Sequence, residues 1–467
     1  VIESENHNDR CRTIDYIATV RYRVQAGGNS VMPESTFAAV RTDVSPVPRR
    51  HRPSLRPLVS AAAGALLLAC GTGPAAADDG QSIDLGDLSL NVYGFVMADA
   101  IYDFKRVDPD WNDTLRVSTI PTRGEPYGGD GEFVTSVRQS RFGVSASYPT
   151  SNGDVTALLE FEWFGTGGDA GQTTPRLRHA WATWKNLGAG QYWSNFMDAD
   201  VFPNTIDYWG PTGMIFYRNQ QIRYTFAVGD DDELAFSLED PGTALTVGRF
   251  RDESSCEIPG APIGNCDSTI NDVVQAKNDV PDVTARYRSN NGWGHWQLAG
   301  IVRKLGYERL DNGNSDYETG YGLNASTVIN TFGSDQLKLQ VAYGDGIGNY
   351  FNDGGLDLAP DDEDLTRVDA TAVTILGIVA YYDHYWNDRW SSTIGWSMTE
   401  LDEEDGMGDE EFKKGQIAST NLLYRPTDHV LTGFEFSWGQ REDVDGTDGE
   451  DFRVQYSLKV DFSLKNN

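Results

Sequence analysis

Residues 452–462 read Phe-Arg-Val-Gln-Tyr-Ser-Leu-Lys-Val-Asp-Phe and alternate apolar and polar side chains without interruption. Successive side chains of an extended strand point to opposite faces, so the apolar residues share one face and the polar residues share the other. A segment of about 9 to 11 residues with this pattern is typical of a tilted strand that crosses a bilayer, with lipid on one side and water on the other. The stretch therefore predicts a transmembrane β-barrel.

The composition of the 467 residues agrees with this interpretation. The chain has 49 glycines, 11% aromatic residues and a mean hydropathy of -0.46, which excludes a bundle of membrane helices. A membrane barrel stays hydrophilic on average because only alternate residues face lipid. A large soluble β-protein, such as a propeller or a solenoid, is the alternative, but the sequence shows no fixed internal repeat.

The alternation begins at Leu88 and continues to the end of the chain, with connections that are short and long in turn. Seven short connections are expected at residues 149–154, 186–190, 229–233, 289–295, 332–335, 387–389 and 426–429. Eight long connections are expected at residues 104–135, 165–174, 195–217, 240–282, 304–316, 344–368, 400–415 and 440–451. Short periplasmic turns and long outer loops are typical of bacterial barrels, so the chain is expected to form an all-β, antiparallel barrel of about sixteen strands.

The segment before the barrel has the three parts of a secretory signal peptide. A basic stretch, Arg49-Arg50-His51-Arg52, precedes an apolar run from Leu58 to Cys70 and a small-residue sequence that ends at Ala77. We therefore expect residues 1–77 to be an N-terminal extension and signal peptide that is removed on export. Residues 78–87 would form a short periplasmic lead-in, and residues 88–467 the outer-membrane barrel.

Three alternatives concern this N-terminal segment. Translation starting at Met32 would shorten the extension. The sequence Leu67-Leu68-Ala69-Cys70 resembles a lipobox, which would lipidate Cys70 in place of cleavage after Ala77. Arg49-Arg50 resembles a twin-arginine signal, but the residues that follow do not fit one.

The charges of the chain are numerous and segregated. A formal net charge of -32 repels nucleic acid at long range, so no nucleic-acid partner is expected. Acidic runs such as residues 361–364 and 402–405 lie in expected loops. Basic side chains are instead assigned by parity to the inner face of the barrel: Arg141, Arg223, Arg286, Arg288, Arg303, Lys338, Arg425, Arg441, Arg453 and Lys459, with Arg138, Arg176, Arg178 and Arg218 on the same face close to strand ends.

Sixteen strands leave an aqueous lumen, and the third long connection is expected to narrow it. Residues 195–211 are unusually aromatic for a loop, and exposure of these rings to water is unfavourable, so we expect the loop to fold into the barrel. The candidate constriction residues are Asp198, Asp200, Asp207, Tyr208 and Trp209. Glu160, Glu162, Glu239 and Glu435 are expected to oppose the arginines on the inner face.

Two cysteines remain in the mature chain, Cys256 and Cys266, in a stretch rich in glycine and proline. Export exposes them to an oxidising compartment, so a disulfide between them is expected. Its expected role is a local staple of one loop.

Several motifs resemble the DcaP-like outer-membrane porins. They are residues 92–105 (Val-Tyr-Gly-Phe-Val-Met-Ala-Asp-Ala-Ile-Tyr-Asp-Phe-Lys), 107–111 (Val-Asp-Pro-Asp-Trp), 118–121 (Ser-Thr-Ile-Pro), 138–143 (Arg-Gln-Ser-Arg-Phe-Gly), 176–180 (Arg-Leu-Arg-His-Ala) and 190–193 (Gly-Gln-Tyr-Trp). The resemblance runs from Tyr93 to Phe462. It implies a homotrimeric channel of sixteen strands that takes up small dicarboxylic and other anionic solutes.

An arginine-lined pore favours anions, because guanidinium groups are fixed, forked donors for carboxylates. The same arginines would also serve to neutralise the loop and strand carboxylates. A general cation-preferring porin is the closest rival, since the loops are acidic. The acidic runs are expected to be a solvated surface beside lipopolysaccharide, with divalent-cation binding as the alternative.

An enzyme is not expected. The mature chain has four histidines, and none is paired locally with a promising nucleophile. A plugged, energy-coupled receptor requires a globular plug before the first strand, for which residues 78–87 leave no room. No cofactor or metal ion is expected.

Overall fold

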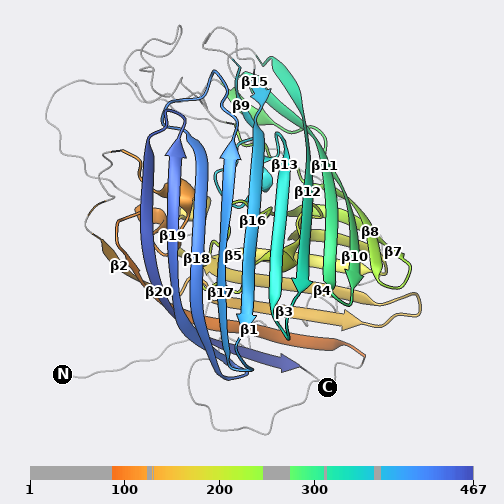
Figure 1. Cartoon of the computed structure of the whole chain (residues 1–467). Helices are drawn as coiled ribbons and strands as arrows, with labels where there is room; N and C mark the ends of the chain where they lie inside the picture. The colour runs from red at the N-terminus through yellow and green to blue at the C-terminus, as the bar shows by residue number, and fades with distance from the viewer. Residues whose placement is uncertain are drawn as a thin grey trace, which may run out of the picture. The chain divides into compact units, whose positions relative to one another are not determined.

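The computed structural model describes residues 87–123, 129, 131–245, 274–309, 313–361 and 370–465. All of them belong to one compact unit, Ile83–Asn467. Among the described residues, no helix combines the length and the apolar character needed to cross a membrane. Long strands dominate this part of the chain (Figure 1).

One antiparallel sheet contains all the long strands. Their bounds are β1 (Ser89–Asp103), β2 (Glu132–Ser136), β3 (Arg141–Tyr148), β4 (Val155–Phe164), β5 (Thr173–Trp184), β6 (Leu187–Trp193), β7 (Arg218–Val228), β8 (Asp232–Glu239), β9 (Val274–Lys277), β10 (Asp282–Asn291), β11 (Gly294–Arg309), β12 (Ser315–Asn330), β13 (Gln336–Asp345), β16 (Thr374–Tyr385), β17 (Trp390–Leu401), β18 (Phe412–Thr427), β19 (Val430–Asp443) and β20 (Asp448–Lys465). A separate pair, β14 (Leu358–Pro360) and β15 (Ala370–Ala372), lies in a loop.

The sheet closes on itself. Strand β1 pairs with β20 over thirteen residues, from Asn91 opposite Lys465 to Asp103 opposite Arg453. Strands β2 and β3 both pair with β1, one after the other along its length, and β9 and β10 pair with β11 in the same way. We therefore count β2 with β3, and β9 with β10, as one interrupted strand of the barrel each. The eighteen strands of this sheet therefore amount to sixteen positions around the barrel, which confirms the predicted fold class.

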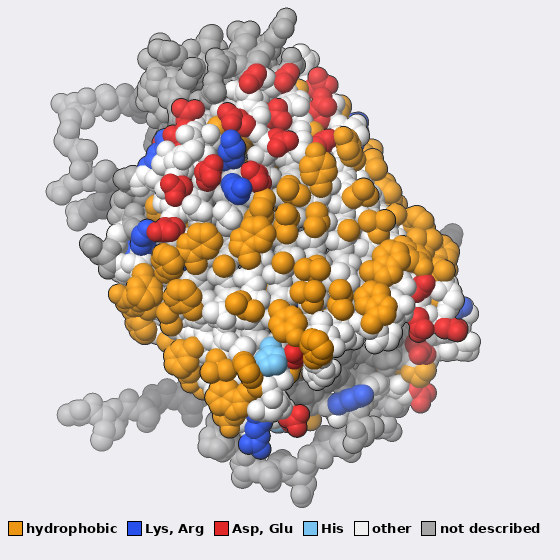
Figure 2. Space-filling model, in the orientation of Figure 1, with side chains coloured by type: hydrophobic (Ala, Val, Ile, Leu, Met, Phe, Trp, Pro, Cys, Tyr) orange, Lys and Arg blue, Asp and Glu red, His pale blue; other side chains and the backbone are white. Residues whose placement is uncertain are grey.

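The alternation that predicted the barrel is seen in β20. Gln455 and Ser457 are buried inside, whereas Tyr456, Leu458 and Val460 are exposed on the outer face. Figure 2 shows such outer hydrophobic side chains as a band across the visible face, with most of the charged side chains beyond its edges. This arrangement matches a barrel with lipid around its middle.

The strand bounds differ from the prediction mainly at the outer ends. The loop expected at 440–451 is only four residues long, because β19 continues to Asp443 and β20 begins at Asp448. Strand β2 begins inside the loop expected at 104–135 and ends at Ser136. The turn expected at 186–190 is shorter, since Lys185 adopts a positive φ of 54° and β6 begins at Leu187.

Candidate functional site

The loop between β6 and β7, residues 194–217 and here called loop 3, is bound to the inner side of the barrel wall. Side chains of nine described strands, β8, β11–β13 and β16–β20, hydrogen-bond to its backbone. Among these contacts are Gln297 to the Met197 carbonyl (3.1 Å), Asn324 to the Phe196 carbonyl (2.8 Å), Lys338 to the Phe202 carbonyl (2.7 Å), Asn421 to the Asn204 carbonyl (2.8 Å), and the Ile206 amide to Glu435 (2.8 Å). Loop 3 thus lies along most of the wall that runs from β8 to β20.

Apolar packing reinforces these hydrogen bonds. Phe196, Val201, Met214 and Ile215 of loop 3 are completely buried and belong to one hydrophobic cluster with inward side chains of β11, β13 and β16. Gly213 permits the closest approach, because a Cβ there would collide with the carbonyl oxygen of Met398 on β17. The aromatic and apolar content of this loop is therefore a consequence of its packing inside the barrel.

The loop between β1 and β2, described at residues 104–123, 129 and 131 and here called loop 1, also packs inside the barrel. Val117 and Ile120 are buried with Leu115, and the short 3-10 helix η2 (Val117–Thr119) contacts β18 and β19. Asp207 of loop 3 accepts hydrogen bonds from the Thr114 hydroxyl (2.9 Å) and the Leu115 amide (3.0 Å). Loops 1 and 3 are therefore joined to one another, a contact that the sequence analysis missed.

A cluster of arginines lies on the opposite part of the wall, around two carboxylates of β4. Glu160 accepts from Arg178 Nε at 2.8 Å, and Glu162 accepts from Arg178 Nη1 at 2.6 Å. Three further guanidinium groups lie within 3.7–3.8 Å of these carboxylates: Arg141, Arg176 and Arg218. Four positive charges around two negative charges leave a surplus of two, and we call Arg141, Arg176, Arg178 and Arg218 the arginine cluster.

The backbone explains why so many basic groups gather here. The pairing of β4 with β5 shifts register after the Glu160–His179 pair, so Phe161 pairs with Leu177 and Arg178 is the extra residue of a bulge. A bulge redirects a side chain, and both Arg178 and His179 are buried on the inner side. Trp181 consequently faces inward as well, over Gly188, where a Cβ would collide with its ring.

Two tyrosines fix the glutamates from the other side. Tyr93 of β1 donates to Glu160 at 2.7 Å, and Tyr208 of loop 3 donates to Glu162 at 2.5 Å. The Tyr208 ring stacks on Phe164 with a centroid distance of 3.7 Å. Burial and the Glu162 charge raise the pKa of Tyr208, so its hydroxyl keeps the proton that it donates. Tyr208 is therefore the contact between loop 3 and the arginine cluster.

The arginines predicted to lie on the inner face have different surroundings. Arg138 pairs with Asp113 (2.6 Å), and Arg303 lies between Asp282 (2.9 Å) and Asp357 (2.8 Å) with its side chain fully buried. These two guanidinium groups connect wall and loop carboxylates and are not open to the lumen. Arg141 and Arg176 keep 27% and 31% of their side chains exposed.

Three more of the predicted arginines lie on β7 and β10. Arg286 pairs with Glu233 (3.1 Å), and Arg288 contacts Asp198 and Asp200 of loop 3. Within the described part of the chain, Arg223 donates to two neutral groups, the Gln221 side chain and the Trp193 carbonyl.

The predicted constriction residues likewise include both buried and exposed side chains. Asp198 and Asp207 are buried in hydrogen bonds, whereas 58% of the Asp200 side chain is exposed. Burial alone would raise the pKa of Asp198, but hydrogen bonds from His295 and Ser326 and the charge of Arg288 hold it below its usual range. The Trp209 ring lies beneath the Arg116 guanidinium, 4.9 Å away.

A cavity of about 250 Å³ lies between the arginine cluster and loop 3. Two guanidinium groups and several aromatic rings line it, among them Arg176, Arg218, Trp193, Tyr208, Trp209 and Phe351. Such a surface offers charged donors for an anion and flat apolar faces beside them. Cys256 and Cys266 lie outside the described residues, so their predicted disulfide stays a prediction.

Comparisons with known proteins agree with this architecture. The family model of the DcaP outer membrane protein matches residues 71–245. The crystal structure of the outer membrane channel DcaP of Acinetobacter baumannii matches with a TM-score of 0.65 and 21% identity, covering 80% of this chain and 97% of that one. The anion-selective porin from Comamonas acidovorans matches with a TM-score of 0.50 and 10% identity, covering 80% and 100%. No curated protein matches the chain. The family resemblance predicted from the sequence is confirmed, and the two structures show the porin fold.

Proposed function

We propose that this chain, a DcaP-like outer-membrane porin, forms a water-filled channel for passive diffusion of small hydrophilic solutes and prefers anionic carboxylates, dicarboxylates among them. The porin fold supports the channel itself. The preference for anions rests on the arginine cluster, where four guanidinium groups surround only two carboxylates.

The position of loop 3 supports this assignment. Its backbone is bound along most of the wall from β8 to β20, whereas Arg141 and Arg176 face it from β3 and β5 and remain partly exposed. Guanidinium groups held by fixed carboxylates keep their donors in place, which favours forked hydrogen bonds to a passing carboxylate. The surplus charge also raises the local concentration of anions. One of the structures with a similar fold, that from Comamonas acidovorans, is described as an anion-selective porin, in keeping with this proposal.

A planar-bilayer experiment tests the selectivity. With a KCl gradient across a membrane that contains the purified protein, we expect a reversal potential of the sign given by chloride permeation. Succinate added to one side should reduce the chloride current more than acetate at the same concentration, because two carboxylates engage the cluster. A reversal potential with the sign of potassium permeation would contradict the proposal.

The competing proposal is a general cation-preferring porin, and the acidic loops favour it. Glu410 and Asp445 flank Arg123 near the outer ends of the strands, and Glu403 pairs with Lys413. These carboxylates lie outside the constriction, where salt screens them within a Debye length of about 8 Å. The measured sign of the reversal potential decides between the two proposals.

We propose a homotrimeric assembly because one part of the barrel wall is built from short strands. Strand β6 has 7 residues and β3 and β8 have 8 each, whereas β11, β12 and β18 have 16. Seven residues span about 24 Å along the strand and less across a membrane once the strand is tilted, against an apolar band of about 25 Å. Lipid cannot satisfy the irregular backbone above such a low wall, so we propose that other copies cover it in a homotrimer. Native mass spectrometry in detergent measures the subunit number.

The proposed location is the outer membrane, with lipopolysaccharide around the outer ends of the strands. Residues 1–77 would be removed on export, which leaves residues 78–87 before the barrel of residues 88–467. N-terminal sequencing of the protein from outer membranes tests this boundary, and a first residue other than Asp78 would contradict it.

A further inference from the structure

We propose that Asp198, Asp200 and His295 form a binding site for a divalent transition-metal ion on the inner wall of the barrel. The three side chains come from two elements. Asp198 precedes the short 3-10 helix η4 (Ala199–Val201) of loop 3, Asp200 lies within it, and His295 is the second residue of β11. This site goes beyond the proposed transport function and does not depend on its selectivity.

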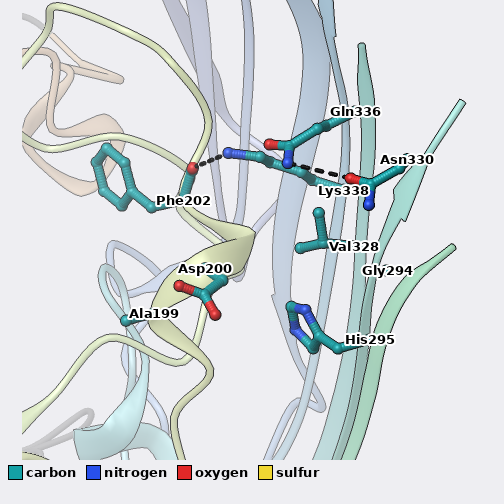
Figure 3. A pocket seen from close by; sticks show the side chains of 9 residues that line it. All are labelled: Ala199, Asp200, Phe202, Gly294, His295, Val328, Asn330, Gln336 and Lys338. Atoms are coloured by element: carbon teal, nitrogen blue, oxygen red, sulfur yellow. Dashed lines mark hydrogen bonds between the residues drawn. The ribbon is translucent and has the colours of Figure 1, made fainter. Parts of the chain in front are cut away.

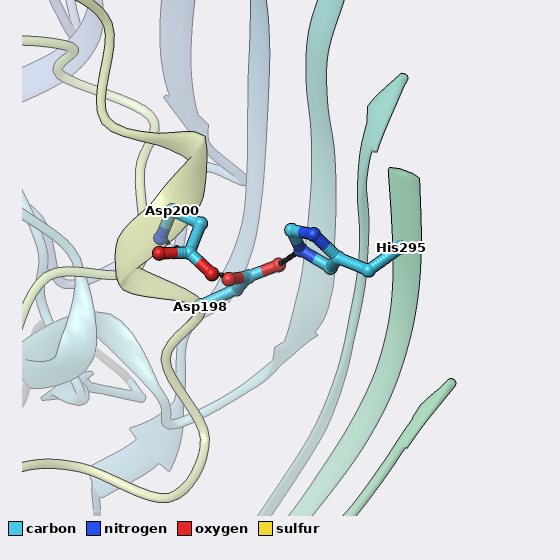
Figure 4. A group of neighbouring side chains, drawn as sticks. All are labelled: Asp198, Asp200 and His295. Carbon is cyan, nitrogen blue, oxygen red and sulfur yellow. Dashed lines mark hydrogen bonds and ion pairs between the residues drawn. The ribbon is translucent and has the colours of Figure 1, made fainter. Parts of the chain in front are cut away.

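The donor atoms already converge. One donor atom from each of the three residues lies within 4.8 Å of the other two. His295 Nε2 is 2.8 Å from Asp198 Oδ2, and Figure 4 shows the two aspartates beside each other with the imidazole pointing toward Asp198. Two carboxylates and one imidazole are a donor set that suits zinc and its neighbours in the transition series.

A cation is already present between the carboxylates. Arg288 donates to Asp198 Oδ1 at 3.3 Å and to Asp200 Oδ2 at 2.5 Å. Two negative charges and one positive charge leave the group with a net charge of -1. The guanidinium neutralises only one of the two carboxylate charges, so a divalent ion would displace it and leave Arg288 facing the lumen.

The surroundings leave space for the ion and its water. A cavity of about 450 Å³ is lined by Asp200 and His295 together with Phe202, Asn330, Gln336 and Lys338 (Figure 3). The ammonium group of Lys338 is held by the Phe202 carbonyl at 2.7 Å and by Asp383 at 3.0 Å. It is therefore engaged on the far side of the cavity from the three donors.

Only a small rearrangement is needed. Ligand atoms of a tetrahedral zinc ion lie roughly 3.4 Å apart, given metal–ligand distances of about 2.0–2.2 Å. The widest separation, now within 4.8 Å, must close by up to about 1.4 Å, whereas His295 Nε2 and Asp198 Oδ2, now 2.8 Å apart, must open by about 0.6 Å. Asp200 can make this movement because its side chain is mostly exposed, while Asp198 is held by Ser326 at 2.7 Å. The ion would join loop 3 to β11 through side chains of both.

Isothermal titration of the detergent-solubilised, chelator-treated protein with Zn²⁺ tests the site. We expect one ion per chain for the wild type, and affinity reduced at least about tenfold in H295Q and in D200N. D200N is the safer variant for folding because Asp200 is exposed. R288Q should bind zinc roughly tenfold more tightly, since it removes a positive charge beside the ion.

The matched control is H384Q. His384 of β16 also lies next to a carboxylate, with its Nδ1 2.6 Å from Asp335, but among the described residues no second acidic side chain joins this pair as Asp200 joins His295 and Asp198. Zinc binding by H384Q should equal that of the wild type. Equal zinc binding by the wild type, H295Q and D200N, or no binding by the wild type, would overturn the proposal.

Discussion

Removing the surplus charge of the arginine cluster should abolish much of the preference for anions. The double variant R141Q/R176Q leaves Arg178 and Arg218 opposite Glu160 and Glu162, so the cluster becomes neutral but its carboxylates remain paired. An anion about 5 Å from one guanidinium in water gains roughly 0.8 kcal/mol. This is about a fourfold change in local anion concentration per charge, and salt at about 0.1 M reduces it.

Removal of both charges in R141Q/R176Q should therefore lower the chloride-to-potassium permeability ratio by roughly three- to tenfold. The reversal potential in a KCl gradient measures this ratio directly. K185Q is the matched control, because it removes one positive charge from the exposed turn between β5 and β6 and should leave the ratio unchanged. An unchanged ratio in R141Q/R176Q, or an equal change in K185Q, would refute the reasoning.

Three further predictions concern anchoring and stability. Arg453 is completely buried against Asp103, so R453M should leave that carboxylate unpaired and destabilise the barrel by about 3–5 kcal/mol, seen as a lower temperature of unfolding on heat-modified gels. E435A removes the acceptor of two loop 3 amides and should increase open-channel current noise in bilayer recordings, whereas quiet channels would contradict the anchoring role. Cys256 and Cys266 should appear linked in mass spectrometry without reductant, and two free thiols would show the prediction to be wrong.

The strands were predictable because the bilayer imposes a strict rule on them. Between lipid and water, every second residue must be apolar, and the pattern of residues 452–462 follows that rule without exception. The rule does not extend above the membrane, where both faces of a strand are wet. Strand β19 continues to Asp443 and β20 begins at Asp448, both through polar residues, so the loop predicted at 440–451 was too long at both ends.

The interior was less predictable because its packing is non-local. Val117 and Ile120 of loop 1 pack against strands that lie some 300 residues later in the chain, and no local period marks them. The presence of Leu115, Val117 and Ile120 in an otherwise polar loop was the available signal. The aromatic content of loop 3 was a stronger signal, because several large rings in one loop need a surface to cover them.

The electrostatics of the site depend on which guanidinium charges are not neutralised by a carboxylate. Parity along a strand predicts that Arg141, Arg176 and Arg303 all point inward, but it does not distinguish an arginine between two aspartates from one beside a shared glutamate. The bulge at Arg178 brings the next residue, His179, to the inner side as well, through a register shift that alternation does not reveal. Since a passing anion responds to the unpaired surplus and not to the number of arginines, selectivity follows from tertiary pairing. The same reasoning makes the glutamates of β4 part of the mechanism: they hold four cations close together while neutralising only two.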